Sequence, residues 1–171
     1  RYLERDGLPI HGVGRQAAVA ELVRGGDGVF HGTLRLSDSV VYAALAVEDP
    51  GGSRVDSNGR KLWELVVHGA DGRPMLEALL QREFDHQSRN WELSYRNARE
   101  AAALYPDHPV AWFNLFQNEK LSFSGPAEDS ARARARARLA ELDRRLRPRA
   151  DLDLDGEAGI MARFADEAGD T

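Results

Sequence analysis

The spacing of hydrophobic positions changes near Pro74, and this change divides the chain. Before Pro74, apolar and polar residues alternate over short stretches that Gly, Pro and Asn residues separate, a pattern typical of β-strands and turns. After it, apolar residues recur every three or four positions as far as about Arg147, which is the spacing of one face of an α-helix. The sequence therefore predicts an α+β protein, in which an antiparallel β module is followed by a helical region.

Strands are predicted in the β module at residues 17–23, 29–36, 40–48 and 62–68. Both alternating faces of residues 40–48 are apolar, so we expect this strand to be central and buried on both sides. Turns are expected at the glycine-containing segments 25–28, 50–52 and 57–59. Short strands at this spacing predict an immunoglobulin-like β-sandwich within residues 1–73, its strands beginning near residue 15. The first fourteen residues add an edge strand or stay outside the sheets.

Helices are predicted over residues 74–147. Pro74 suits the first turn of a helix, where its missing N–H is not needed. Three apolar stripes follow, carried by Leu76, Leu79, Leu80 and Phe84, then by Trp91, Tyr95, Ala98, Ala102 and Tyr105, and last by Ala131, Ala135, Leu139, Leu142 and Leu146. A further helix is expected to begin at Pro109. The short links predict antiparallel neighbours, and residues 148–171 form an acidic tail or the start of one more helix, around residues 157–166.

Composition narrows the classes of function. The chain has 171 residues, a formal net charge of −5 and a pI of about 5.6, which argues against a nucleic-acid-binding domain. It contains no cysteine, so disulfides, thiolate metal sites and cysteine nucleophiles are excluded. It has no run of 18 apolar residues, and we expect no membrane span. Because it opens at Arg1 without a signal peptide, we expect a piece of a longer protein.

Four alternating Ala-Arg pairs occupy residues 131–138. On a helix, Arg132 and Arg136 lie on one flank of the alanine stripe, while Arg134 and Arg138 lie on another. Charge divided over two flanks favours a solvated helix face over a surface for an anionic partner.

Two acidic segments contain possible cation ligands. Residues 151–156 follow the start of an EF-hand loop, but position 12 of that loop is Ala162 and not the glutamate that calcium requires. We expect an acidic linker there. The loop with Glu48, Asp49, Asp56 and Asn58 has oxygen ligands as well, yet such side chains more often bond their own backbone in turns.

No catalytic motif is present. The five histidines have no zinc spacing, and the sequence has neither a nucleophile elbow nor a glycine-rich phosphate loop. We therefore predict a non-catalytic segment without cofactor or metal, and a small hydrolase whose residues carry no motif stays the weaker alternative. The three tryptophans are expected to pack in cores, because their rings bury a large apolar area.

Residues 28–34, 42–49 and 55–59, together with Trp63, resemble the immunoglobulin-type modules of the starch-binding class. In that order the family has a strand after a glycine turn, a strand that ends in an acid, a loop rich in Asp and Asn, and a closing tryptophan strand. The resemblance implies a sandwich fold and, as an alternative function, carbohydrate binding. The residues that would carry it are Tyr42, Trp63, Asp56 and Asn58.

Residues 101–115 are similar to the junction between two tetratricopeptide repeats, with Ala101, Pro106, Trp112 and Leu115 at matching positions. Phe116 stands where that family has glycine, and no second copy follows at a period of 34 residues. A β-sandwich followed by such helices resembles the region that precedes the thioredoxin-like domain of some bacterial envelope disulfide reductases. This resemblance implies an extracytoplasmic location and a parent protein that carries the thiol chemistry elsewhere.

The function predicted from these patterns is protein recognition or spacing within a larger protein, with a protein partner or a neighbouring domain of the same chain bound by the helical region. Its expected exposed polar contacts are Arg89, Asn90, Arg96, Asn114 and Asn118.

Overall fold

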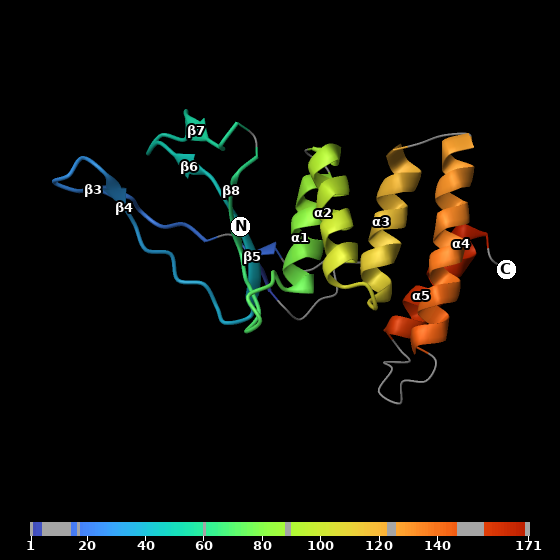
Figure 1. Ribbon diagram of the computed structural model, residues 1–171. Coiled ribbons are helices and arrows are strands. Elements are labelled where there is room, and N and C mark those ends of the chain that lie inside the picture. The colour runs from blue at the N-terminus through green and yellow to red at the C-terminus, as the bar shows by residue number, and fades with distance from the viewer. Residues whose placement is uncertain are drawn as a thin grey trace. The chain divides into compact units, whose positions relative to one another are not determined.

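The protein is described by a computed structural model that covers residues 2–4, 15–16, 18–59, 61–87, 90–122, 126–146 and 156–169 (Figure 1). The chain divides into two compact units, Arg1–Gln81 and Arg82–Thr171. The division falls inside helix α1 (Leu76–Gln87), so the first turns of α1 belong to one unit and the last turns to the other.

The first unit contains short antiparallel strands. They are β1 (Tyr2–Glu4), β2 (Arg15–Gln16), β3 (Val23–Arg24), β4 (Phe30–His31), β5 (Val40–Leu45), β6 (Val47–Glu48), β7 (Val55–Asp56) and β8 (Trp63–Val66). Four of them form one sheet in the order β2-β1-β5-β8, while β3 pairs with β4 and β6 pairs with β7 in two separate ribbons. Helices and short antiparallel strands are thus both present, as the α+β prediction requires; the immunoglobulin-type sandwich stays a prediction.

The predicted central strand is confirmed over residues 40–45 but not to residue 48, because Val47 and Glu48 are exposed and belong to the separate ribbon of β6 and β7. β5 lies between β1 and β8, and residues 40–44 are all buried. Val41, Tyr42 and Ala44 form a core with Ala78 of α1, and Leu62, Val66 and Met75 pack against it. The apolar character of both faces is what allows β5 to be covered on both sides.

Two strand predictions were wrong in extent. The described part of residues 17–23 is strand only at Val23, and residues 29–36 are strand only at β4. The turn between them was right, because Gly28 adopts a φ of +82° and Asp27 accepts a hydrogen bond from the Val29 N–H at 3.0 Å. An isolated two-stranded ribbon is only marginally stable because no third strand or packed face supports it, and here the pairing covers two residues of each strand.

The facing of β8 also differs from the prediction. Trp63 is 48% exposed and Leu65 42% exposed, so this pair points away from the core. Opposite residues of an antiparallel pair share a face, and Val66 lies opposite the buried Tyr42. Glu64 is on that same side, where its carboxylate accepts a hydrogen bond from the Tyr42 hydroxyl at 3.0 Å.

The second unit continues from α1 through α2 (Trp91–Leu104), α3 (Pro109–Ser122), α4 (Pro126–Leu146) and α5 (Glu157–Ala168). Helix α3 packs against α2, α4 and α5, and α4 also packs against α5 (Figure 1). The predicted stripe of α4 is confirmed, since Ala131, Ala135, Leu139, Leu142 and Leu146 are all buried. The predicted helix in the tail is present as α5, where Phe164 packs against Phe113 and Phe116 of α3. A tetratricopeptide arrangement stays a prediction.

Helix α2 is turned relative to the predicted stripe. Its buried residues are Ser94, Asn97, Ala98, Ala101 and Ala102, while Trp91 is 54% exposed. Phe84 on α1 is likewise 42% exposed, against the prediction that it belongs to the apolar face. Polar side chains can occupy interior positions of α2 because they form hydrogen bonds with other polar groups inside the unit.

Candidate functional site

Six polar side chains meet where α1, α2 and α3 come together in the second unit. We call them the Glu83 cluster: Glu83 and His86 of α1, Ser94 and Asn97 of α2, and Asn114 and Asn118 of α3. All except Asn114 are buried, and no more than 5% of any of those five residues is exposed. Such burial is tolerated only when polar groups find partners.

Glu83 is the acceptor at the centre of this cluster. Its Oε1 lies 2.8 Å from Asn118 Nδ2 and 3.0 Å from Ser94 Oγ, and its Oε2 accepts from Asn114 Nδ2 at 3.3 Å. Asn118 Nδ2 also donates to the main-chain carbonyl of Asn114 at 3.0 Å. The three helices are therefore tied together through one carboxyl group.

Burial raises the pKa of Glu83 above its ordinary value of 4.5, because the ionised form loses its hydration inside the unit. The hydrogen bonds from Asn118 and Ser94, and the charge of His86, act in the opposite direction without cancelling the effect of burial on this pKa. His86 itself lies 2.9 Å from Asn97, through its Nδ1 and the Asn97 Nδ2. An acid and an imidazole thus occur together, but both are closed off from solvent in this arrangement.

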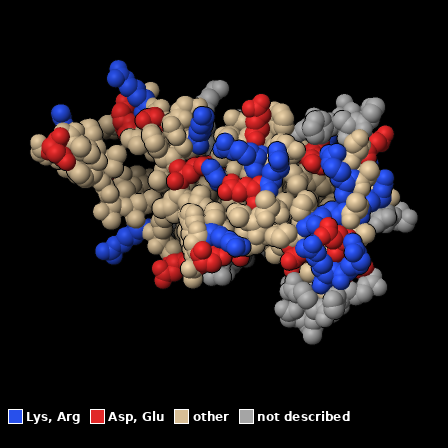
Figure 2. Space-filling model, in the orientation of Figure 1, with Lys and Arg blue, Asp and Glu red and all other residues tan. Residues whose placement is uncertain are grey.

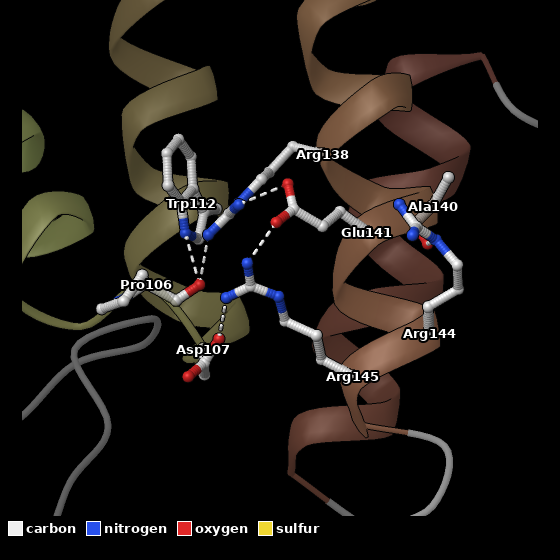
Figure 3. A network of polar contacts seen from close by, with 8 residues as sticks. All are labelled: Pro106, Asp107, Trp112, Arg138, Ala140, Glu141, Arg144 and Arg145. Carbon is white, nitrogen blue, oxygen red and sulfur yellow. Dashed lines mark hydrogen bonds and ion pairs between the residues drawn. The ribbon is translucent and has the colours of Figure 1, made fainter.

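The arginines of α4 form a second set of polar contacts (Figure 3). The guanidinium of Arg138 lies over the Trp112 ring at 3.8 Å and donates to the carbonyl of Pro106 and to Glu141. Arg145 bridges Glu141 and Asp107. The Trp112 indole N–H donates to the same Pro106 carbonyl at 3.0 Å, so the turn before α3 is fastened to α4.

The opposite flank of the Ala-Arg run contacts α5. Arg132 and Arg136 donate to the main-chain carbonyls of Glu167 and Ala168, the last residues of that helix. Positive side chains are favourable at a helix C-terminus, where carbonyls lack intrahelical partners. The predicted division of the run into two flanks is confirmed, and Figure 2 shows acidic and basic side chains interspersed over the face it displays. The expectation that the run is simply solvated is wrong for Arg132 and Arg138, which are partly buried.

The residues predicted to bind a partner are not gathered in one place. Arg96 is exposed on α2, and Asn90 is exposed as the N-cap of that helix, where it accepts from the Leu93 N–H at 3.3 Å. Asn114 and Asn118 belong to the Glu83 cluster, and the prediction of an exposed Asn118 is wrong because only 4% of it is exposed. Arg89 lies outside the described residues.

The residues of the carbohydrate alternative also separate. Tyr42 is 1% exposed, so the prediction that its ring could stack on a sugar is wrong, whereas Trp63 is half exposed. Asp56 accepts from the Asn58 N–H at 2.9 Å, and Asn58 donates to the carbonyl of Leu62 at 3.1 Å. These two residues shape the turn before β8.

The acidic loop likewise bonds to itself. Asp49 accepts hydrogen bonds from the Ser53 hydroxyl and N–H at 2.7 Å each and from the Arg54 N–H at 3.1 Å. These bonds lower the pKa of Asp49, and the bond from the Ser53 hydroxyl has the largest effect. The carboxylate of Asp49 thus bonds to backbone and side-chain groups of its own turn, as the composition of this loop predicts. The described residues contain no group of three or more His, Asp or Glu side chains placed to hold a metal ion. Most of the EF-hand-like segment, residues 151–155, lies outside them.

A row of three side chains on α2, of which Trp91 and Arg99 are exposed and Tyr95 is partly buried, was missed by the sequence reasoning. Trp91, Tyr95 and Arg99 follow one another at intervals of four residues, and we call them the Trp91 row. The rings of Trp91 and Tyr95 are 6.5 Å apart, and the guanidinium of Arg99 lies 5.9 Å from the Tyr95 ring. No signal in the sequence indicates this row, because Ser94 and Asn97, whose burial turns Trp91 outward, have the composition of surface positions.

Comparison with protein-family models, curated proteins and solved structures gives no match to this chain. In the part of the chain that the structure describes, none of the helices has the length and apolar character needed to cross a membrane.

Proposed function

We propose that this chain is a non-catalytic protein-interaction or spacer module of a larger protein, and that the Trp91 row of α2 is its contact surface. The observation that carries the proposal is the exposure of Trp91, 54%, in line with Tyr95 and Arg99 on one helix face. Trp, Tyr and Arg are the residues that most often dominate the binding energy of protein interfaces. Tyr and Trp side chains also lose little conformational freedom on binding, because each has only two side-chain torsions.

The remaining polar groups of this unit support the same proposal. Asn114 and Asn118 are engaged by Glu83, and Arg138 and Arg145 by groups at the turn before α3. Side chains already used inside the unit have little to offer a partner. On α2, by contrast, Trp91, Arg96 and Arg99 are exposed and Tyr95 is partly exposed, so aromatic and cationic groups are accessible there.

The double variant Trp91→Ala/Tyr95→Ala is expected to weaken capture of the partner by more than about tenfold, because truncating a hot-spot residue typically removes about 2 kcal/mol or more. The measurement is quantitative capture from the source cells, with bound proteins identified by mass spectrometry. Leu121→Ala is the matched control, since it removes another exposed apolar side chain, 71% exposed, from α3. Equal capture by both variants, with unchanged circular dichroism, would discard the surface.

A carbohydrate-binding module is the second candidate, and the exposed Trp63 and Leu65 side of β8 favours it. An exposed tryptophan ring offers an apolar face on which a sugar can stack. Isothermal titration with soluble glucans tests this candidate, and Trp63→Ala is expected to abolish any heat of binding. If titration of the folded wild-type protein releases or absorbs no heat, the carbohydrate candidate is removed. The proposal for the α2 surface is not affected by that result.

A further inference from the structure

The Glu83 cluster contains one hydroxyl group placed between two oxygen atoms. Ser94 Oγ lies 3.0 Å from Glu83 Oε1 and 2.8 Å from Asn118 Oδ1. Both separations are hydrogen-bond distances, so each contact requires a hydrogen between its two oxygens. Ser94 has a single hydroxyl hydrogen, and an amide oxygen has none.

The orientation of the Asn118 amide does not relieve this shortage. Its Nδ2 faces both the carbonyl of Asn114 and Glu83 Oε1, at 3.0 and 2.8 Å, and its two hydrogens serve those two acceptors. Turning the amide over would place its oxygen against both of them. Asn118 Oδ1 therefore faces Ser94 and needs the hydroxyl hydrogen of Ser94.

Of the three groups that meet here, Glu83 is the one that can supply the missing hydrogen. If Glu83 carries a proton on Oε1, that proton is donated to Ser94 Oγ, Ser94 donates to Asn118 Oδ1, and Asn118 Nδ2 donates back to Glu83 Oε1. This is a closed ring of three hydrogen bonds that joins α1, α2 and α3. If Glu83 is ionised, two oxygens of the ring face each other without a hydrogen, inside a region where an uncompensated charge is costly.

The surroundings of Glu83 supply little to hold a negative charge. The side chains that contact it from α2 and α3 are Ser94, Asn114 and Asn118, and none of them is charged. Among the described residues, His86 of α1 is the charged group that acts on Glu83, and its effect is smaller than that of burial. The direction of the Glu83 pKa agrees with the count of hydrogens.

We propose that Glu83 is kept as a neutral carboxylic acid within the second unit and acts as a proton-dependent latch between α1, α2 and α3. Because the pKa of Glu83 is raised in the folded state, the stability it contributes is complete below the unfolded-state pKa. That stability is lost as the pH rises through the folded-state pKa. Mild acid therefore tightens this part of the protein, and ionisation loosens it.

The direct test is an infrared pH titration of the full chain. The carboxylic-acid C=O band of Glu83 is expected to persist well above about pH 4.3, where an ordinary glutamate is half ionised, and to be missing from the difference spectrum of Glu83→Gln. In parallel, urea unfolding is followed as a function of pH. Above the ordinary glutamate pKa, the unfolding equilibrium constant of the wild type should rise by up to about tenfold per pH unit more steeply than that of Glu83→Gln.

Glu92→Gln is the matched control, because Glu92 is an exposed glutamate of α2 and its replacement should leave the pH dependence unchanged. A wild-type spectrum without a carboxylic-acid band above the ordinary range would overturn the proposal. A pH dependence that persists in Glu83→Gln would assign the effect to another group, such as His86, and would overturn it as well. The wild-type titration decides the question even if Glu83→Gln does not fold.

Discussion

Replacing Phe164 by alanine is expected to lower the free energy of unfolding of the second unit by about 3–5 kcal/mol. Phe164 is 1% exposed and is the largest fully buried side chain of α5. Its ring lies edge-on to Phe113 at 5.8 Å and stacked on Phe116 at 5.5 Å, so the variant loses both the buried area and the ring contacts. The cavity left against α3 adds to the cost because the neighbouring helices can collapse only partly.

The measurement is urea unfolding followed by circular dichroism, with hydrogen exchange read separately for the amides of α5. Asp166→Ala, a change at an exposed position of the same helix, serves as the control and should alter the unfolding free energy by no more than about 0.5 kcal/mol. If Phe164→Ala costs no more than Asp166→Ala, then α5 is not part of the helical core.

Replacing Tyr42 by alanine is expected to be of similar size in the first unit, again about 3–5 kcal/mol. Tyr42 is the largest fully buried side chain of this unit, and it packs with Val41, Ala44 and Ala78. Tyr42→Phe separates the contribution of the ring to stability from that of the hydroxyl group. It keeps the ring, removes the hydrogen bond to Glu64 and is expected to cost about 1 kcal/mol.

Hydrogen exchange of the β5 and β8 amides measures both Tyr42 variants, because the ladder between these strands reports the opening of the sheet. Protection should fall strongly in Tyr42→Ala and slightly in Tyr42→Phe. Equal and small losses would mean that the sheet does not depend on this core.

The elements that depend on local pattern could be predicted from the sequence. The α4 stripe was found because Ala and Leu recur there at helical spacing and the residues between them are charged apart from three alanines. The central strand was found over residues 40–45 because both of its faces are apolar, although the same pattern wrongly extended the strand to residue 48. Neither prediction needed information from a distant part of the chain.

The face of β8 could not be predicted in the same way. Trp63 and Leu65 form the more apolar alternation, and on composition they belong inside. The outcome depends on Tyr42, more than twenty residues earlier. Its hydroxyl donates a hydrogen bond to Glu64, so Glu64 and Val66 lie on the side of Tyr42 while Trp63 and Leu65 face away. A hydrogen bond between distant residues leaves no periodic trace in the sequence.

The candidate site was hidden for a related reason. Asn114 and Asn118 are four residues apart and appear from the sequence to be a polar surface, as Ser94 and Asn97 do on α2. Only the packing of three helices brings these amides to Glu83, where the carboxyl group satisfies them. Sequence reasoning assigned Asn114 and Asn118 to a binding surface because it lacked their shared acceptor.

The position of the unit boundary within α1 affects how the protein can be divided. A fragment that starts at Trp91 would take Glu83 and His86 away from Ser94, Asn97 and Asn118, and would leave these three buried side chains without their hydrogen-bond partners on α1. A fragment that stops before Leu76 would remove Ala78 from the core around Tyr42. Neither half can therefore be excised, duplicated or grafted onto another protein unless this one helix travels with it.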